Sequence, residues 1–166
     1  GRAIAEVHEA AAQFAPADPA AYGSVDREWE RIVERAARAP AAVRAEVDRI
    51  AAWKADRPRG AAFGLTHGDC NAANALHGDG QVHIIDFDEP CWSWWACDLV
   101  RPLNEVRDRP QRTVRAIADA LVEGYRECRA LPDEEVAAMP WLLRLKALEV
   151  HLWLREAWTG DEALGG

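Results

Sequence analysis

Apolar residues recur at intervals of three and four along most of the chain, and this spacing predicts amphipathic helices. Ser24 is placed to cap one of them and Pro40 to close it. That helix is expected to bury a stripe formed by Trp29, Ile32, Val33 and Ala36. Pro110 and Pro140 fit the first turns of the last two helices. Together these signals predict helices over residues 2–14, 24–40, 41–56, 98–107, 110–129 and 140–158.

A shorter stretch in the middle of the chain has the character of strands. Residues 63–66 read as one strand, and apolar segments at 75–77 and 81–85 flank the turn signal Gly78-Asp79-Gly80, which predicts a hairpin. Residues 89–95 carry no regular pattern and are expected to be irregular. The chain is therefore expected to be an α+β protein, mostly helical, with a short β-hairpin and a single domain over residues 1–166.

Three polar residues lie close to this hairpin in the sequence. Asp69 precedes it, Asn74 follows five residues later, and Asp86 ends its second apolar segment. A three-residue hairpin loop would place Asn74 opposite Ile84 and diagonal to Asp86, within reach of one ion. A two-residue loop would reverse that relation, because a one-residue change of register turns every side chain to the other face. A lone Asp or Asn is usually a turn former, but a carboxylate after an apolar strand is costly unless it is paired or metal-bound.

These residue types fit the chemistry of phosphoryl transfer. Transfer from ATP needs little covalent help, so an enzyme mainly positions the acceptor hydroxyl and neutralises charge with Mg²⁺. Asp69 is expected to orient and deprotonate the hydroxyl. Mg²⁺ keeps several waters and takes one or two protein oxygens beside the phosphates, which suits Asn74 and Asp86 as its ligands. The sequence therefore predicts Mg²⁺ as a cofactor and ATP as a co-substrate.

With these motifs the chain resembles the aminoglycoside phosphotransferase and choline kinase-like family of small-molecule kinases. The resemblance rests on residues 67–74, on residues 84–88 and on Asp98 near the start of a helix. It implies a mostly helical, protein-kinase-like C-terminal lobe with the β-hairpin at the active site. For single residues it implies that Asp69 is the catalytic base, that Asn74 and Asp86 bind Mg²⁺, and that Asp98 and His67 support the catalytic loop.

The part of such a kinase that covers ATP is not recognisable in this chain. The family fixes ATP under an N-terminal β-rich lobe that carries a phosphate-covering loop and a strand lysine. This sequence has no Gly-x-Gly-x-x-Gly, and its two lysines, Lys54 and Lys146, fall in helical patterns. Cys70 and Asn71 stand where relatives often carry a hydrophobic residue and His. We expect the N-terminal nucleotide lobe to be absent from this chain and to be its partner, and the isolated chain to be inactive.

Residues after the hairpin are candidates for the acceptor side of the site. Asp88, Glu89 and Trp92 are expected to bind the substrate, although Asp88 also fits a second metal ligand or a structural residue. Core packing accounts for at least two of the three tryptophans at 92, 94 and 95, and one fits a wall that holds a substrate cation by a cation–π contact. The acceptor is expected to be a small hydroxyl compound, and aminoglycoside, choline, homoserine and ketosamine all fit.

Composition limits the partners of the chain. Its 166 residues, 49% of them apolar, are enough for one core. The formal charge of −8 argues against nucleic acid and is compatible with a cationic acceptor. No apolar run approaches the ~18 residues of a membrane span, and no signal-peptide core is present, so a cytoplasmic protein without a membrane partner is expected. The four cysteines are expected to be reduced, and no compact His/Cys set for zinc is present.

Two other classes of function stay open on the sequence. The lack of a recognisable nucleotide lobe favours a non-catalytic, kinase-like binding domain. The carboxylates also permit metal-dependent phosphohydrolysis, but two-metal hydrolases hold their metals ~4 Å apart with more ligands, and the sequence offers no supporting His-rich set. Binding that depends on ATP separates a kinase from a hydrolase.

Overall fold

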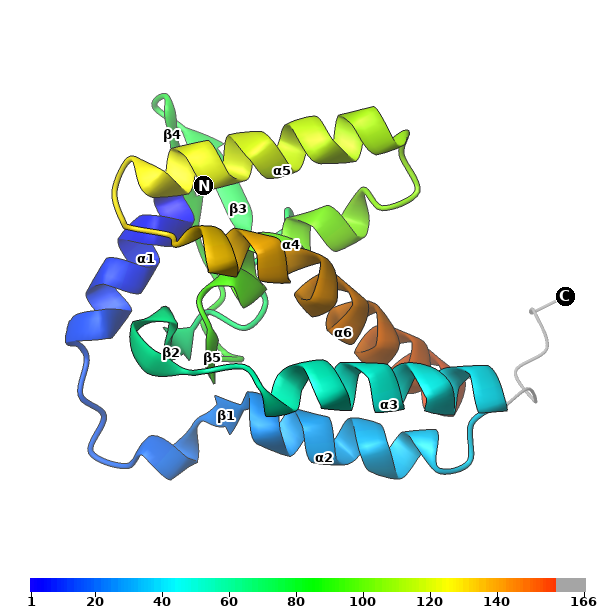
Figure 1. Cartoon of the computed structure of the whole chain (residues 1–166). Helices are drawn as coiled ribbons and strands as arrows, with labels where there is room; N and C mark the ends of the chain where they lie inside the picture. Colours follow the sequence, from blue (N-terminus) through cyan, green and yellow to red (C-terminus); the bar gives the residue numbers. More distant parts are fainter. Residues whose placement is uncertain (158–166) are drawn as a thin grey trace, which may run out of the picture.

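The computed structural model describes residues 1–157, and most of these residues are helical (Figure 1). The helices are α1 (Arg2–Gln13), α2 (Val25–Ala36), α3 (Ala41–Ala55), α4 (Ala96–Glu105), α5 (Gln111–Arg126) and α6 (Asp133–Ala157). The strands are β1 (Gly23–Ser24), β2 (Phe63–Thr66), β3 (Ala75–Gly78), β4 (Gln81–Ile84) and β5 (Cys91–Trp94). The predicted α+β class is confirmed. Trp158, the last residue of the final predicted helix, lies outside the described residues.

Side-chain signals in the sequence explain how α2 begins and which side of it is buried. The Ser24 hydroxyl accepts a hydrogen bond from the Arg27 amide at 3.3 Å, so the predicted cap is confirmed. Ile32 is buried as predicted, but the prediction for Val33 was wrong, because that side chain is 45% exposed. The buried stripe of α2 is therefore narrower than the sequence pattern suggested.

Helix α6 begins at Asp133, so the prediction that Pro140 occupies its first turn was wrong. The amides of Glu135 and Val136 donate to the Pro132 carbonyl, and acidic residues in the first turn favour a helix start there. Pro140 lies inside the helix and removes one backbone hydrogen bond, a loss that the buried residues around it offset. Within the described residues, no helix, α6 included, is both long and apolar enough to cross a membrane.

A three-stranded sheet in the order β1-β5-β2 leads into the candidate site. Strand β5 pairs parallel with β1 and antiparallel with β2, where Phe63 lies opposite Trp94 and Thr66 opposite Cys91. The prediction that residues 89–95 are irregular was therefore wrong for residues 91–94. Aromatic residues fit the pleated surface of a sheet well, but both partner strands of β5 come from distant parts of the chain, which a local pattern does not reveal.

The predicted hairpin is present as the two-stranded sheet β3-β4, and its register is that of the two-residue loop. Gly78 pairs with Gln81 and Ala75 with Ile84, which leaves a two-residue turn at Asp79 and Gly80. Both turn residues have positive φ, 53° and 74°, as a tight hairpin turn of the primed type requires. Of the two loop lengths that the sequence left open, the structure has the two-residue one, because Asp-Gly alone satisfies the turn.

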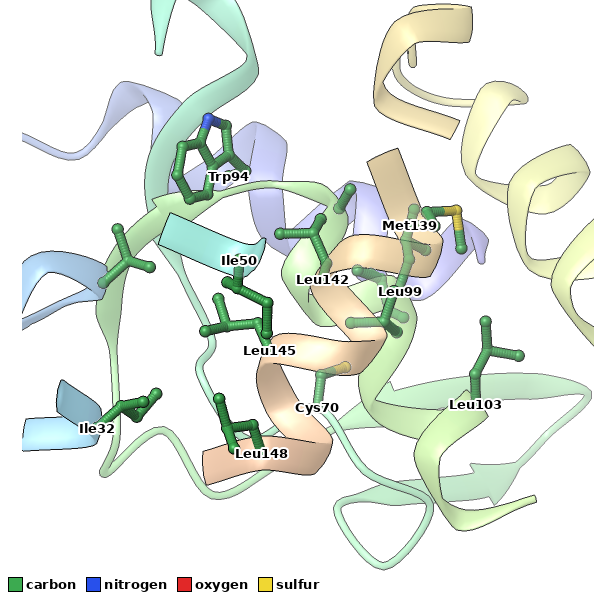
Figure 2. Packing of buried hydrophobic residues seen from close by; sticks show 14 of the residues in the cluster. Ile32, Ile50, Cys70, Trp94, Leu99, Leu103, Met139, Leu142, Leu145 and Leu148 are labelled. Carbon is green, nitrogen blue, oxygen red and sulfur yellow. The ribbon is translucent and has the colours of Figure 1, made fainter. Parts of the chain in front are cut away.

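The core lies where α6 packs against α2, α3 and α4. Figure 2 shows side chains of these four helices meeting in one cluster, among them Ile32, Ile50, Leu99, Leu142, Leu145 and Leu148. Cys70, which follows Asp69, is 2% exposed and belongs to the same cluster. Burial raises the pKa of the Cys70 thiol to about 12, so this group stays neutral and packs as an apolar side chain. The core thus anchors the loop that carries Asp69.

Candidate functional site

The candidate site is built on the loop of residues 67–74, called the Asp69 loop below, which follows β2. The chain turns at Gly68, where φ is +85°. A Cβ at this position would lie 1.9 Å from the Glu89 carbonyl oxygen, so the backbone of residue 89 packs directly against the loop. Only glycine allows both this φ value and this approach. The close contact brings residues distant in sequence to the two sides of one site.

Asp98 at the start of α4 binds the main chain of the Asp69 loop. Its carboxylate accepts hydrogen bonds from the amides of His67 at 2.7 Å and Gly68 at 3.0 Å. The ring Nε2 of His8, on α1, lies 2.8 Å from the same carboxylate, and His8 Nδ1 lies 2.8 Å from the Tyr125 hydroxyl. His8 and Asp98 are 0% and 1% exposed. A buried carboxylate with this many partners fixes the loop to α1, α4 and α5.

The ring of His67 connects the Asp69 loop to the segment that carries Asp86. The Asp69 amide donates to His67 Nδ1 at 3.2 Å, so the neutral ring carries its hydrogen on Nε2. That hydrogen is directed to the Ile85 carbonyl oxygen, 2.9 Å from Nε2. The Phe87 ring packs on the imidazole with a centroid distance of 4.5 Å. The residues on both sides of Asp86 therefore contact His67.

Asp69 and Asn74 lie side by side. The Asn74 side-chain amide donates to the Asp69 main-chain oxygen at 2.9 Å and to the Asp69 carboxylate at 3.1 Å. Asn71 donates to the same carboxylate oxygen at 2.9 Å. Because the Asn74 N–H groups are engaged, the amide oxygen is the atom of this side chain that is available to a cation. An amide oxygen of this kind is a suitable ligand for Mg²⁺.

Asp86 is held less directly than Asp69 and Asn74. The Ile85 amide donates to the Asn74 carbonyl at 2.9 Å, so Asn74 lies opposite Ile85, as the two-residue loop requires, and not opposite Ile84. Strand alternation does not decide the direction of the Asp86 side chain, because its φ is +68° and the chain has left the β conformation. Asp86 is exposed. Its role as a metal ligand beside Asn74 stays a prediction.

The three residues assigned to the acceptor side lie in two different places. Asp88 and Glu89 line an open cleft of about 610 Å³ next to α2 and α6, and both are exposed. Trp92 lies on β5, and its ring N–H donates to the Pro19 carbonyl at 3.0 Å. Trp94 and Trp95 are 1% and 5% exposed and pack in the interior. The substrate-binding assignments of Asp88, Glu89 and Trp92 stay predictions.

Two residues of α4 that the sequence analysis missed also contact the Asp69 loop. Arg101 forms an ion pair with the Asp69 carboxylate, and Glu105 accepts a hydrogen bond from the Ala72 amide at 3.2 Å. Both stand on the helical face of Asp98, at three and seven positions after it. That periodicity was the available signal: once Asp98 is assigned to the loop, the same helix face places Arg101 and Glu105 beside it.

A small pocket of about 40 Å³ borders the Asp69 loop at Gly68 and is also lined by Arg101 of α4. It contains charged side chains from α2 and α6 as well as apolar ones. Within residues 1–157, no group of three or more His, Cys, Asp and Glu side chains is arranged to hold a metal ion. A Mg²⁺ ion that takes most of its ligands from phosphate and water needs no such group.

A model of the phosphotransferase enzyme family (APH) matches residues 1–131. Homoserine kinases of three bacteria are similar in sequence. The identities are 36% over 160 residues for Methylobacterium radiotolerans, 34% over 164 residues for Rhizobium johnstonii and 32% over 160 residues for Mesorhizobium japonicum. Each alignment covers 92% of this chain and 49% of the relative. The chain therefore spans about half the length of these relatives.

Solved structures of small-molecule kinases share the fold. An amicoumacin kinase in complex with AMP-PNP, Ca²⁺ and Ami superimposes with a TM-score of 0.81 at 20% identity, over 96% of this chain and 51% of that chain. A microcompartment-associated aminopropanol kinase gives a TM-score of 0.72 at 24% identity, over 92% of this chain and 51% of that chain. The predicted kinase-like fold is thereby confirmed.

Proposed function

The chain belongs to the phosphotransferase enzyme family, and we propose that it carries the acceptor side of an ATP- and Mg²⁺-dependent kinase that phosphorylates a hydroxyl of a small molecule. The observation that carries this proposal is the joint placement of Asp69 and Asn74. The Asp69 carboxylate is fixed by Asn71, Asn74 and Arg101, while Asn74 keeps its oxygen free for a cation. A base and a metal ligand held this close together are the parts that phosphoryl transfer requires.

Each residue of the site has a separate task in this proposal. Asp69 accepts the proton of the acceptor hydroxyl and directs the oxygen towards the phosphoryl group. Asn74 and Asp86 hold Mg²⁺, which supplies charge neutralisation on the phosphates when MgATP is bound. Asp98 and His67 keep the Asp69 loop in one conformation, so that little reorganisation is needed when the acceptor binds.

A nucleotide lobe from outside the described residues completes the proposed enzyme. Neither lysine of this chain is placed on a strand: Lys54 lies in α3 and bonds to Asp26 at 2.7 Å, and Lys146 lies in α6 and bonds to Glu149 at 2.7 Å. A kinase of this class needs a lysine on its nucleotide lobe to hold the phosphates. We therefore assign this chain the acceptor, the base and the metal ligands, and assign the phosphate clamp to a second lobe.

Substitutions in the protein at its full natural length test the proposal. Asp69→Asn keeps the shape of the side chain but removes the base, so turnover should fall by about 10²–10⁴-fold with little change in MgATP affinity. Asp86→Ala should weaken MgATP binding as well, because it removes a metal ligand. Turnover is measured with homoserine, aminopropanol, choline and an aminoglycoside, and affinity by calorimetric titration. The exposed turn residue Asp79 is the control, and Asp79→Asn should change neither quantity.

The same experiment separates the alternatives. Wild-type levels of turnover in Asp69→Asn would contradict the assignment of the base. MgATP binding without any phosphorylated product from the full-length protein would favour a non-catalytic binding domain. Release of phosphate from a phosphorylated compound without ATP would favour a hydrolase.

A further inference from the structure

The small pocket beside the Asp69 loop, called the Glu28 pocket below, lies between this loop and a charged group on α2. Its walls include the apolar side chains of Val25, Ile32, Val100, Leu142 and Leu145. It reaches the Asp69 loop at Gly68, and Arg101 of α4, the ion-pair partner of Asp69, also lines it. Glu28, Cys91 and Glu149 line both this pocket and the wider cleft with Asp88 and Glu89, so the pocket is open towards that cleft.

The charges around the Glu28 pocket are paired except for one. Arg101 forms an ion pair with Asp69, and Lys146 bonds to Glu149 at 2.7 Å. In the part of the chain that the structure describes, Glu28 has no ion-pair partner, and its polar contact is the Cys91 thiol at 3.8 Å. The pocket therefore offers one carboxylate that is not neutralised by the protein.

The surroundings of Glu28 make this carboxylate ready to accept a cation. Its pKa is raised, mainly because burial disfavours the charged form and also because Glu149 repels it; Lys146 and Arg31 offset this only in part. Burial also raises the pKa of the Cys97 thiol in the pocket wall to about 12, so it adds no negative charge near neutral pH. A ligand cation at Glu28 would supply the missing partner.

We propose that the Glu28 pocket binds the ammonium group of a short aliphatic amino alcohol, with the hydroxyl of the same molecule directed to Asp69. This inference rests on the proposed function for the direction of the hydroxyl. The Glu28 carboxylate binds the ammonium group by a charge-assisted hydrogen bond. The carbon chain of the acceptor packs on the apolar walls between Glu28 and the Asp69 loop.

The walls of the pocket distinguish between acceptor classes. An aminosugar would place several hydroxyl groups against Val25, Ile32 and Leu145, where they lose water without gaining hydrogen bonds. A volume of about 40 Å³ holds only a few water molecules. A short unbranched amino alcohol has one polar group at each end and apolar atoms between them, which suits a pocket lined by both charged and apolar side chains.

Ligand binding to the 166-residue chain tests this inference without requiring turnover. Aminopropanol and propanediol have nearly the same size, but only aminopropanol carries an ammonium group. Dissociation constants are measured by ligand-detected NMR for the wild type, for Glu28→Gln and for Glu30→Gln, which changes an exposed carboxylate on the same helix. Homoserine, which carries an ammonium and a carboxylate group, is measured as a third probe.

The inference predicts that Glu28→Gln weakens aminopropanol and homoserine binding by about tenfold or more and changes propanediol binding by less than about twofold. Glu30→Gln should leave all three unchanged. Equal affinity of the wild type for aminopropanol and propanediol would overturn the inference, and so would an equal loss for all three probes in Glu28→Gln. Because no nucleotide is present, selective amine binding by a protein without kinase activity would contradict only the proposed function.

Discussion

The Asp69 loop and the segment of residues 85–89 meet at one site but are held in opposite ways. The loop is fixed by the buried Asp98 and His67 and by Cys70, which lies in the core. The segment is exposed at every position from 85 to 89, and it contacts the loop through the main chain of Ile85, the Phe87 ring and the Glu89 carbonyl beside Gly68. One side of the site is thus part of the folded core, and the other lies on its surface.

The difference indicates which partner completes each side. Asp69 and Asn74 take their geometry from this chain alone, as their proposed roles of base and metal ligand require. Asp86, Asp88 and Glu89 have no ion-pair or side-chain hydrogen-bond partner within the described residues, so they are free to bind a cation or a ligand. We infer that folding alone fixes Asp69 and Asn74, whereas the binding of a metal or a ligand orders residues 86–89.

Removal of Asp98 should give the largest effect on stability. Asp98→Ala would leave two loop amides and the buried His8 without their partner, and this should cost about 3–5 kcal/mol of unfolding free energy. Urea denaturation measures the loss. Asp88→Ala, which removes an exposed carboxylate, is the control and should change stability by less than about 0.5 kcal/mol. Similar losses for the two variants would show that the Asp69 loop is no better anchored than the exposed segment.

Gly68 provides a sharper test of the contact between the two regions. Gly68→Ala would strain a residue with φ of +85° and push against the Glu89 carbonyl, at a cost of at least about 2 kcal/mol. Gly78→Ala is the matched control, because a Cβ there meets no atom within 4 Å. Its stability should change by less than about 1 kcal/mol. Equal stability of the two alanine variants in urea denaturation would contradict the close approach at residue 89.

Asp86 should affect binding far more than stability. Asp86→Asn keeps a side chain that tolerates positive φ, and the residue is exposed, so the unfolding free energy should change by less than about 0.5 kcal/mol. Loss of the negative charge should weaken MgATP binding to the full-length protein by at least about tenfold. Calorimetric titration measures the affinity. A large stability loss with unchanged affinity would mean that Asp86 supports the fold and not the metal.

Glu28 should give the smallest effect on stability, and the size of this effect should depend on pH. Burial raises the pKa of Glu28, so the folded chain favours the protonated form of this side chain. The charged carboxylate therefore destabilises the fold: this effect is absent below the ordinary pKa of Glu and appears as the pH rises through the raised pKa. Glu28→Gln should therefore match the wild type in acid and be more stable near neutral pH. Urea denaturation at both pH values tests this, with Glu30→Gln as the control. Lower stability of Glu28→Gln near neutral pH would contradict it.

Sequence patterns predicted the elements whose signals are local. The Ser24 cap, the strand at 63–66 and the hairpin around Asp79 all depend on neighbouring residues, and each is present. Strand β5 was missed because its pairing depends on two distant strands. The register of the hairpin stayed open because the Gly78-Asp79-Gly80 run fits loops of two and three residues, and the two-residue turn that the structure shows has positive φ at both Asp79 and Gly80.

For the site, the sequence predicted the residues near the motifs and missed those that only the fold brings in. Asp69, Asn74 and Asp98 could be assigned from spacing and resemblance. His8 is far from Asp98 in the sequence and lies on the buried, otherwise apolar face of α1, so its contact with Asp98 had no local signal. Arg101 and Glu105 had one, because they share a helix face with Asp98. Glu28 lay within a charge-rich helix, where spacing suggested a solvated face and nothing marked it as part of a pocket.

The central claim is that Asn74 and Asp86 hold one cation, and paramagnetic broadening by Mn²⁺ tests it most directly. Mn²⁺ prefers the same oxygen ligands as Mg²⁺, and it broadens the NMR signals of nearby groups. With MnATP added to the isotope-labelled full-length protein, the Asn74 side-chain amide and the Asp86 main-chain amide should broaden together at the lowest Mn²⁺ concentration, before Asp79 at the hairpin turn. Broadening of the Asp86 signal with an unchanged Asn74 side chain would contradict the account.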